Sequence, residues 1–172
     1  MTSPPRPDQR RDGPPLGFAR HDHARCVAAA LAAAEARCSD RDIRFTPVRR
    51  RVLEILLDGH RARGAYEILD RLREEGFGSQ PPVAYRALDF LTRHGFAHRI
   101  ERLNAFIACC HPGHAHVPAF LICRQCDAVA ETPIAPAAGG LRQAAQASGF
   151  RIERAVMEAE GLCPVCARGA AA

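Results

Sequence analysis

The chain has 172 residues, of which 47% are hydrophobic and 25% charged, a composition typical of one folded domain or two small ones. No apolar run approaches the ~20 residues that a membrane-spanning helix needs, so we expect no membrane association. The net charge of +5 lies in the first part of the chain, where 19 arginines face 14 acidic residues up to Leu103, while five face five beyond it. This asymmetry suggests two modules with different partners.

The N-terminal segment lacks the material for a hydrophobic core. Residues 1–21 are rich in proline and charge, which predicts a disordered tail. A first helix is then predicted over Asp22–Cys38, with Cys26 on its buried face. The apolar run Val27–Ala34 is mostly alanine and starts too late for a secretory signal, so we expect a cytoplasmic protein.

Start and stop signals predict further helices. Thr46 and Pro47 form the N-cap and first position of one helix, which Gly59 ends. Another is predicted over Ala65–Glu75, and Gly76 is its C-terminal stop. Each carries one apolar face at helical spacing, which predicts packing against a shared core.

The next segment of the sequence predicts a DNA-binding unit. A helix runs from Pro81 to the residue before Gly95, and extended runs at Phe96–Glu101 and Ala105–Cys109 form a hairpin with Asn104 at its turn. Short helices followed by such a hairpin indicate a winged helix-turn-helix, whose last helix enters the major groove of DNA.

Beyond residue 112 the pattern changes to a small α+β unit. Strands are predicted at Phe120–Cys123, Ala128–Thr132 and Phe150–Glu160, with a helix at Leu141–Ser148. A unit this small usually needs metal or oligomerisation for stability. The predicted division is a tail at 1–21, a winged-helix DNA-binding domain at 22–109, a hinge at 110–117, a dimerisation and metal-binding domain at 118–168, and a short tail at 169–172.

Two C-x-x-C pairs form the strongest chemical motif: Cys123 with Cys126, and Cys163 with Cys166. Two intervening residues let a tight turn present both thiolates to one ion, and two such pairs complete a tetrahedral site. Four sulfurs favour zinc and leave no open position, which indicates a structural site. Redox C-x-x-C motifs are disfavoured, because the sequence predicts neither pair at the start of a helix after a strand.

A second metal-binding set is predicted where the two units meet. His98 and Cys109 lie on the two hairpin strands, while His116 and Glu131 follow in the next unit, and such a mixed set of nitrogen, sulfur and oxygen suits zinc. The residues alone leave other ligands equally possible: Cys110, His111 and His114.

DNA contacts are predicted on the exposed face of the helix that begins at Pro81. Arg86 can form two hydrogen bonds with guanine, and Tyr85 can contact a thymine methyl or a phosphate. Arg49 is a candidate phosphate contact on an earlier helix. Solvated arginine is common on helices, so these residues alone do not decide the matter.

The ordered motifs resemble those of a known family. They are TPVR (46–49), AYEIL (65–69), PVAYRALDFL (82–91), GFAHRIE (95–101) and the two C-x-x-C pairs. This set resembles the ferric uptake regulator family and, within it, the zinc uptake regulator branch. The family usually has Thr-Val where this chain has Val83-Ala84 at the start of the recognition helix, which removes a hydroxyl from that position.

The resemblance implies a zinc-responsive repressor that binds palindromic operators on double-stranded DNA as a homodimer and controls zinc uptake genes. It implies two zinc ions per chain, one structural at the four cysteines and one regulatory at His98, Cys109, His116 and Glu131. It implies no enzymatic activity and no small organic substrate. An iron-, manganese- or peroxide-responsive regulator of the same family is the alternative, and a zinc-dependent enzyme is a weaker one.

Overall fold

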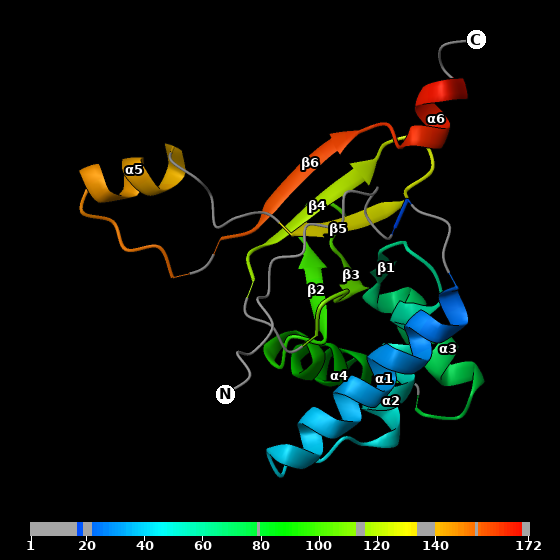
Figure 1. Cartoon of the computed structure of the whole chain (residues 1–172). Helices are drawn as coiled ribbons and strands as arrows, with labels where there is room; N and C mark the ends of the chain where they lie inside the picture. Colours follow the sequence, from blue (N-terminus) through cyan, green and yellow to red (C-terminus); the bar gives the residue numbers. More distant parts are fainter. Residues whose placement is uncertain are drawn as a thin grey trace, which may run out of the picture.

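Two small sheets and the helices around them make up the protein (Figure 1). The computed structural model describes residues 17–18, 22–78, 80–112, 116–133, 140–153 and 155–169. Apart from residues 17–18, the predicted N-terminal tail lies outside this part of the chain. So do His114 in the predicted hinge and residues 170–172 of the predicted C-terminal tail.

The first two helices begin where capping residues allow. Helix α1 (His23–Asp40) starts after Asp22, whose carboxylate accepts a hydrogen bond from the backbone N–H of Arg25 at 3.2 Å. Helix α2 (Pro47–Leu57) has Thr46 as its N-cap, as predicted. Cys26, predicted to be buried, is only half-buried. The buried residues of α1, Ala34 and Cys38, lie in the C-terminal half of the helix.

Helices α3 (Ala65–Glu74) and α4 (Pro81–Arg93) both end with a glycine in the left-handed region. Gly76 has a φ of 77°, and Gly95 has a φ of 71°. The residue after each glycine donates its N–H back into the helix: Phe77 to the Leu72 carbonyl at 2.9 Å and Phe96 to the Leu91 carbonyl at 2.8 Å. These closures fix the direction in which the chain leaves each helix.

The hairpin follows α4 directly. Strands β2 (Ala97–Ile100) and β3 (Ala105–Ala108) pair antiparallel, and Asn104 occupies the turn with a positive φ of 45°. A third strand that the sequence did not predict, β1 (Arg63–Gly64), pairs with β3 to give the order β1-β3-β2. This arrangement of helices and sheet is that of a winged helix.

One hydrophobic core joins the four helices to the hairpin. Its most deeply buried members come from every helix, because each amphipathic helix turns its apolar face inward. Val83, which replaces the family's usual threonine, is partly buried against this core. Fully buried side chains in the core include Val52, Leu56, Ile68, Leu72, Leu88 and Leu91.

The second sheet has the order β5-β4-β6. Strand β4 (Pro118–Cys123) pairs antiparallel with β5 (Val129–Pro133) and parallel with β6 (Met157–Gly161). The predicted strand over Phe150–Glu160 is therefore wrong in its first part, because pairing with β4 begins only at Met157.

Two helices accompany the second sheet. Helix α5 (Gly140–Ala147) stands away from the rest of the chain in Figure 1. Helix α6 (Pro164–Gly169), which the sequence did not predict, follows β6 and carries Cys166. Among the described residues, no helix combines the length and apolar character needed to cross a membrane.

The two sheets meet through direct contacts. Arg61 forms an isolated antiparallel bridge with Ala128, and the backbone N–H of Val129 donates to the carbonyl of His60 at 3.0 Å. A second, smaller core packs the hairpin on the face of β4 and β5. Its buried members are Ile100, Ile107, Phe120, Ile122 and Val129. This interface positions the hairpin residues over the second sheet.

Truncating Leu91 tests the larger core. Leu91 is fully buried, so Leu91→Ala should lower the free energy of unfolding by about 2–5 kcal/mol through lost burial and a residual cavity. Leu103→Ala is the matched control, because Leu103 is 37% exposed in the hairpin turn. Urea denaturation followed by circular dichroism measures both, and equal losses for the two variants would contradict this core.

Candidate metal centres

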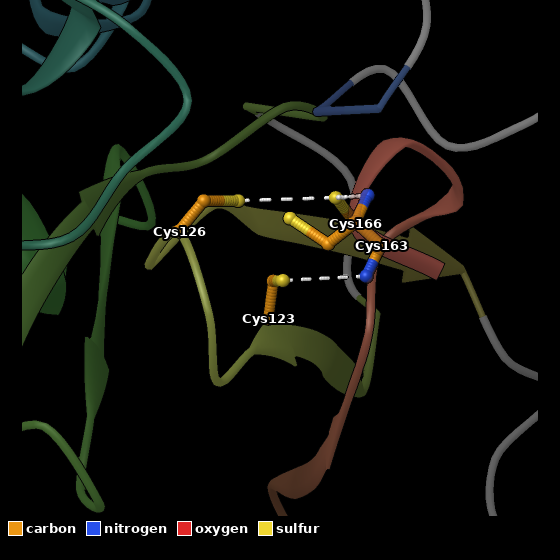
Figure 2. A group of neighbouring side chains, drawn as sticks. All are labelled: Cys123, Cys126, Cys163 and Cys166. Atoms are coloured by element: carbon orange, nitrogen blue, oxygen red, sulfur yellow. Dashed lines mark hydrogen bonds between the residues drawn. The ribbon is translucent and has the colours of Figure 1, made fainter. Parts of the chain in front are cut away.

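The four cysteines of the C-x-x-C pairs converge on one point (Figure 2). Their sulfurs all lie within 4.8 Å of one another, and we call them the cysteine cluster. Cys123 ends β4, Cys126 lies in the turn before β5, and Cys163 and Cys166 lie at the start of α6. Residues about forty positions apart are thus adjacent, because β6 runs parallel to β4 and ends beside it.

Hydrogen bonds from backbone N–H groups favour the thiolate form of two of these cysteines. The N–H of Cys163 donates to Cys123 Sγ at 3.3 Å and lowers the pKa of that thiol to about 6. The N–H of Cys166 donates to Cys163 Sγ at 3.4 Å and lowers the pKa of Cys163 as well. The hydrogen bond of the Cys166 thiol to Cys163 raises the pKa of Cys166 to about 12. A thiophilic cation at this point would bind the thiolate form of all four.

The second predicted set also comes together. Ligand atoms of His98, Cys109, His116 and Glu131 all lie within 4.8 Å of one another, and we call this group the interdomain cluster. Cys109 Sγ lies 3.7 Å from His116 Nε2 and 4.0 Å from Glu131 Oε1. His98 belongs to β2, Cys109 directly follows β3, and Glu131 belongs to β5, so both sheets contribute.

Glu131 is the buried centre of the interdomain cluster, with only 3% of its surface exposed. Its Oε1 lies 2.6 Å from His116 Nε2 and 3.3 Å from His98 Nε2, while its Oε2 accepts the backbone N–H of Cys110 at 2.8 Å. Burial by itself would raise the pKa of Glu131, but these neighbours outweigh it and hold the pKa at about 2. The carboxylate is therefore ionised although it is buried.

Two further features suit the cluster to a cation. His98 Nε2 is buried, and its 3.3 Å contact with Glu131 Oε1 lacks good hydrogen-bond geometry. Burial, together with the negative charge of Glu131, raises the pKa of Cys109 far above its usual range. A cation at this point would be coordinated by the His98 nitrogen. It would also favour the thiolate form of Cys109 and balance the negative charge of Glu131. Two imidazoles, one thiolate and one carboxylate form a set that suits zinc.

The other ligands that the sequence left open border this cluster but do not join its close set. Cys110 lines a cavity of about 190 Å³ together with Cys109 and residues of α1, and burial, with the negative charge of Glu131, raises the pKa of Cys110 to about 12. The backbone N–H of His111 donates to Cys109 Sγ at 3.4 Å. His114 lies outside the described residues. Neither Cys110 nor His111 belongs to a described group with ligand atoms this close together.

The exposed face of α4 carries the predicted DNA contacts. Tyr85 is 47% exposed, and Arg86 is exposed and forms no ion pair with any described residue. Other arginines of this unit are held by acidic neighbours: Arg50 by Glu35 and Glu54, Arg51 by Glu75, Arg63 by Glu67, Arg71 by Asp58 and Arg93 by Asp89. Arg86 is thus available to an external anion or base edge.

Arg49 is positioned differently from Arg86. Its guanidinium lies 3.7 Å from the centre of the Phe90 ring, and its Nη1 donates to the carbonyl of Arg44. This stacking links α2 to α4 and fixes the direction of the side chain. A contact between Arg49 and a phosphate would use the guanidinium N–H groups that do not bond to the Arg44 carbonyl.

The chain is similar to named regulators over most of its length. It is 39% identical over 137 residues to the zinc uptake regulation protein of Escherichia coli (strain K12), covering 79% of this chain and 80% of that protein. The chain belongs to the zinc uptake regulation protein family. The protein of the same name from Shigella flexneri has the same identity and coverage.

Solved structures agree with this family membership. A zinc uptake regulator complexed with zinc and DNA has a TM-score of 0.80 and 37% identity, and the match covers 85% of this chain and 98% of that one. The holo form of XcZur has a TM-score of 0.72 and 39% identity, with 86% of this chain and 99% of that one covered. No family model matches the chain.

Metal binding at the interdomain cluster should depend on pH. Because the pKa of Cys109 is far above neutrality, zinc must displace its proton, whereas Glu131 is already ionised. Zinc affinity should therefore rise about tenfold per pH unit between about pH 7 and pH 8.5. Competition with a chromophoric chelator measures the affinity, and Cys109→Ser should flatten the slope. An affinity that does not change with pH would contradict this ligand assignment.

Proposed function

We propose that this protein is a zinc-responsive transcriptional repressor that binds palindromic operators as a zinc-loaded homodimer and controls zinc uptake genes. The observation that carries this proposal is the interdomain cluster, which takes ligands from the hairpin of the winged helix and from the second sheet. A cation bound there would fix the orientation of one unit relative to the other. The solved relative that is complexed with zinc and DNA supports this assignment.

The regulatory step follows from the charges of the cluster. Zinc supplies two positive charges that neutralise the carboxylate of Glu131 and the thiolate of Cys109. Together, His98 on β2 and Glu131 on β5 would hold the hairpin against the second sheet. By linkage, zinc strengthens operator binding by the same factor by which the operator strengthens zinc binding. At a low zinc concentration the interdomain cluster would lose its ion, and the repressor would dissociate from the operator.

The cysteine cluster has a structural role in this proposal. Cys123 joins β4 to the turn, while Cys163 joins β6 to α6, so one ion would connect the adjacent C-terminal ends of these two strands. Four protein ligands leave no position open for a substrate in either cluster, which supports a regulator over an enzyme. We therefore propose two zinc ions per chain.

DNA reading is assigned to α4. Arg86 would form two hydrogen bonds with a guanine edge, and Tyr85 would contact a thymine methyl or a phosphate. Arg49 would contact a phosphate while it remains stacked on Phe90. Two recognition helices related by a two-fold axis would match a pseudo-palindromic operator.

The homodimer is proposed to form through the second sheet and α5. Leu121 and Met157 are exposed on neighbouring strands, on the face opposite Phe120. Leu141 of α5 is 54% exposed, and Phe150 is 67% exposed. Large apolar side chains gathered in this way favour burial by a second copy, which also suits a unit with so small a core of its own.

Substituting one cysteine from each cluster separates their roles. Cys109→Ser should keep one zinc per chain and the dimer but lose the zinc dependence of operator binding, which we expect to be about 5–150-fold in the wild type. Cys163→Ser should lose the structural zinc and give an unstable or monomeric protein. Metal analysis, light scattering and gel-shift titration of free zinc, iron and manganese measure these effects. Cys26→Ser, outside both clusters, is the control. Full zinc-dependent repression by Cys109→Ser would refute the regulatory site.

Arg86→Ala tests the recognition helix. Loss of a bidentate contact with a base should weaken specific binding by about 1–3 kcal/mol and relax base preference at one position of each half-site. Arg93→Ala is the matched control, because Arg93 ends the same helix and pairs with Asp89 at 2.6 Å. Fluorescence anisotropy on operator and random duplexes measures both variants. Equal weakening on the two duplexes would instead assign Arg86 to a phosphate.

A further inference from the structure

Three side chains of the second sheet occupy a single row across its strands. Phe120 on β4 is the register partner of Glu131 on β5 and also of Glu158 on β6. Directly paired residues project from the same face of a sheet. All three side chains therefore point toward the hairpin of the winged helix, and we call them the contact row.

Each member of the contact row reaches a different part of the hairpin. Glu131 belongs to the interdomain cluster and lies beside His98, and the Phe120 ring centre lies 5.6 Å from the His98 ring centre. At the other end of the row, the carboxylate of Glu158 accepts two consecutive backbone N–H groups, from Glu101 at 2.7 Å and from Arg102 at 3.0 Å. These two N–H groups belong to the turn of the wing.

The spacing of the row matches that of the hairpin. Strands β5 and β6 lie two inter-strand steps apart, about 9–10 Å. His98 and Glu101 are three residues apart along β2 and its turn, about 10 Å in extended chain. The hairpin thus contacts the second sheet at two points, with His98 beside Glu131 and the wing turn beside Glu158.

We propose that Glu158 is a positioning residue that holds the wing turn on β6 without any metal, so that zinc has only to fix the opposite end of the hairpin. This role rests on the proposed zinc-dependent function, which it deepens. Two points of attachment fix the direction of the hairpin, whereas a single point would leave the hairpin free to rotate. The interdomain cluster supplies one point, and Glu158 supplies the other.

A carboxylate is suited to this role. Its two oxygens accept one N–H each, and an ionised acceptor makes these bonds stronger than neutral ones. The neighbouring Arg102–Glu160 ion pair joins the same two segments, but Arg102 is more than half exposed in its side chain, so we expect that pair to contribute little. The backbone bonds of Glu158 therefore carry most of the attachment.

Linkage gives the expected consequence. If Glu158 favours the closed orientation before zinc binds, its removal lowers the fraction of molecules in which the interdomain cluster is assembled. The apparent zinc affinity of that cluster then falls by the same fraction. Operator affinity at a fixed, sub-saturating zinc concentration falls as well.

The experiment compares Glu158→Ala and Glu158→Gln with two matched controls in the full chain. Amide hydrogen exchange should show the Glu101 and Arg102 N–H groups losing protection in Glu158→Ala. Zinc affinity of the interdomain cluster should fall about 5–30-fold, and Glu158→Gln, which keeps one acceptor, should lie between Ala and wild type. Arg102→Ala keeps both N–H groups, and Glu153→Gln changes an exposed acid outside β6, so each should stay within about twofold of wild type.

Other readouts separate positioning from general destabilisation. Zinc content at the cysteine cluster and the urea midpoint should remain those of wild type in Glu158→Ala. Two results for Glu158→Ala would overturn the proposal. One is a Glu101 and Arg102 amide protection that remains as in wild type, and the other is an unchanged zinc affinity although this protection is lost. Failure of the proposed function looks different, because the wild type itself would then show no zinc-dependent operator binding. The exchange and zinc-affinity measurements need no DNA.

Discussion

The buried carboxylate of Glu131 is the constraint on which the arrangement of the two units depends. An ionised group with 3% exposure must be balanced by its surroundings, and its neighbours are two imidazoles, a thiol and a backbone N–H. Since His98 comes from the hairpin and Glu131 from the second sheet, satisfying this charge requires both sheets to stay together. We propose that a cation satisfies it, so that the state of this local site would set the orientation of the two units.

The rest of the molecule supports that contact from both sides. The glycine-closed ends of α3 and α4 direct the chain into the hairpin, and the core beneath α4 fixes the hairpin to the recognition helix. On the other side, the cysteine cluster connects the ends of β4 and β6, so the row of Glu131, Phe120 and Glu158 presents a firm surface. In the proposed function, the orientation set at this surface would reach Tyr85 and Arg86 through the core that packs α4 against the hairpin.

Charge is distributed along the chain in keeping with this division. The larger part of the arginine excess lies in the winged helix, with the rest in residues 1–21, yet most of the described arginines near α2 and α3 are paired with acids. In the proposed function, net charge would contribute less to DNA binding than the placement of Arg86, which forms no ion pair with any described residue. The second unit exposes several large apolar side chains, among them Leu141, Phe150 and Met157, where a second copy is proposed to bind.

Local sequence signals determined the helix caps, the glycine stops, the hairpin turn and the two C-x-x-C pairs, because these depend on residues within a few positions of one another. Tertiary structure decided the remainder. It brought Cys109 rather than Cys110 into the interdomain cluster, added β1 and α6, and shortened the last strand to Met157–Gly161. Glu158 carried no sequence signal, because its role arises from strand register, which pairs residues far apart in the chain and is set by the packing of whole sheets.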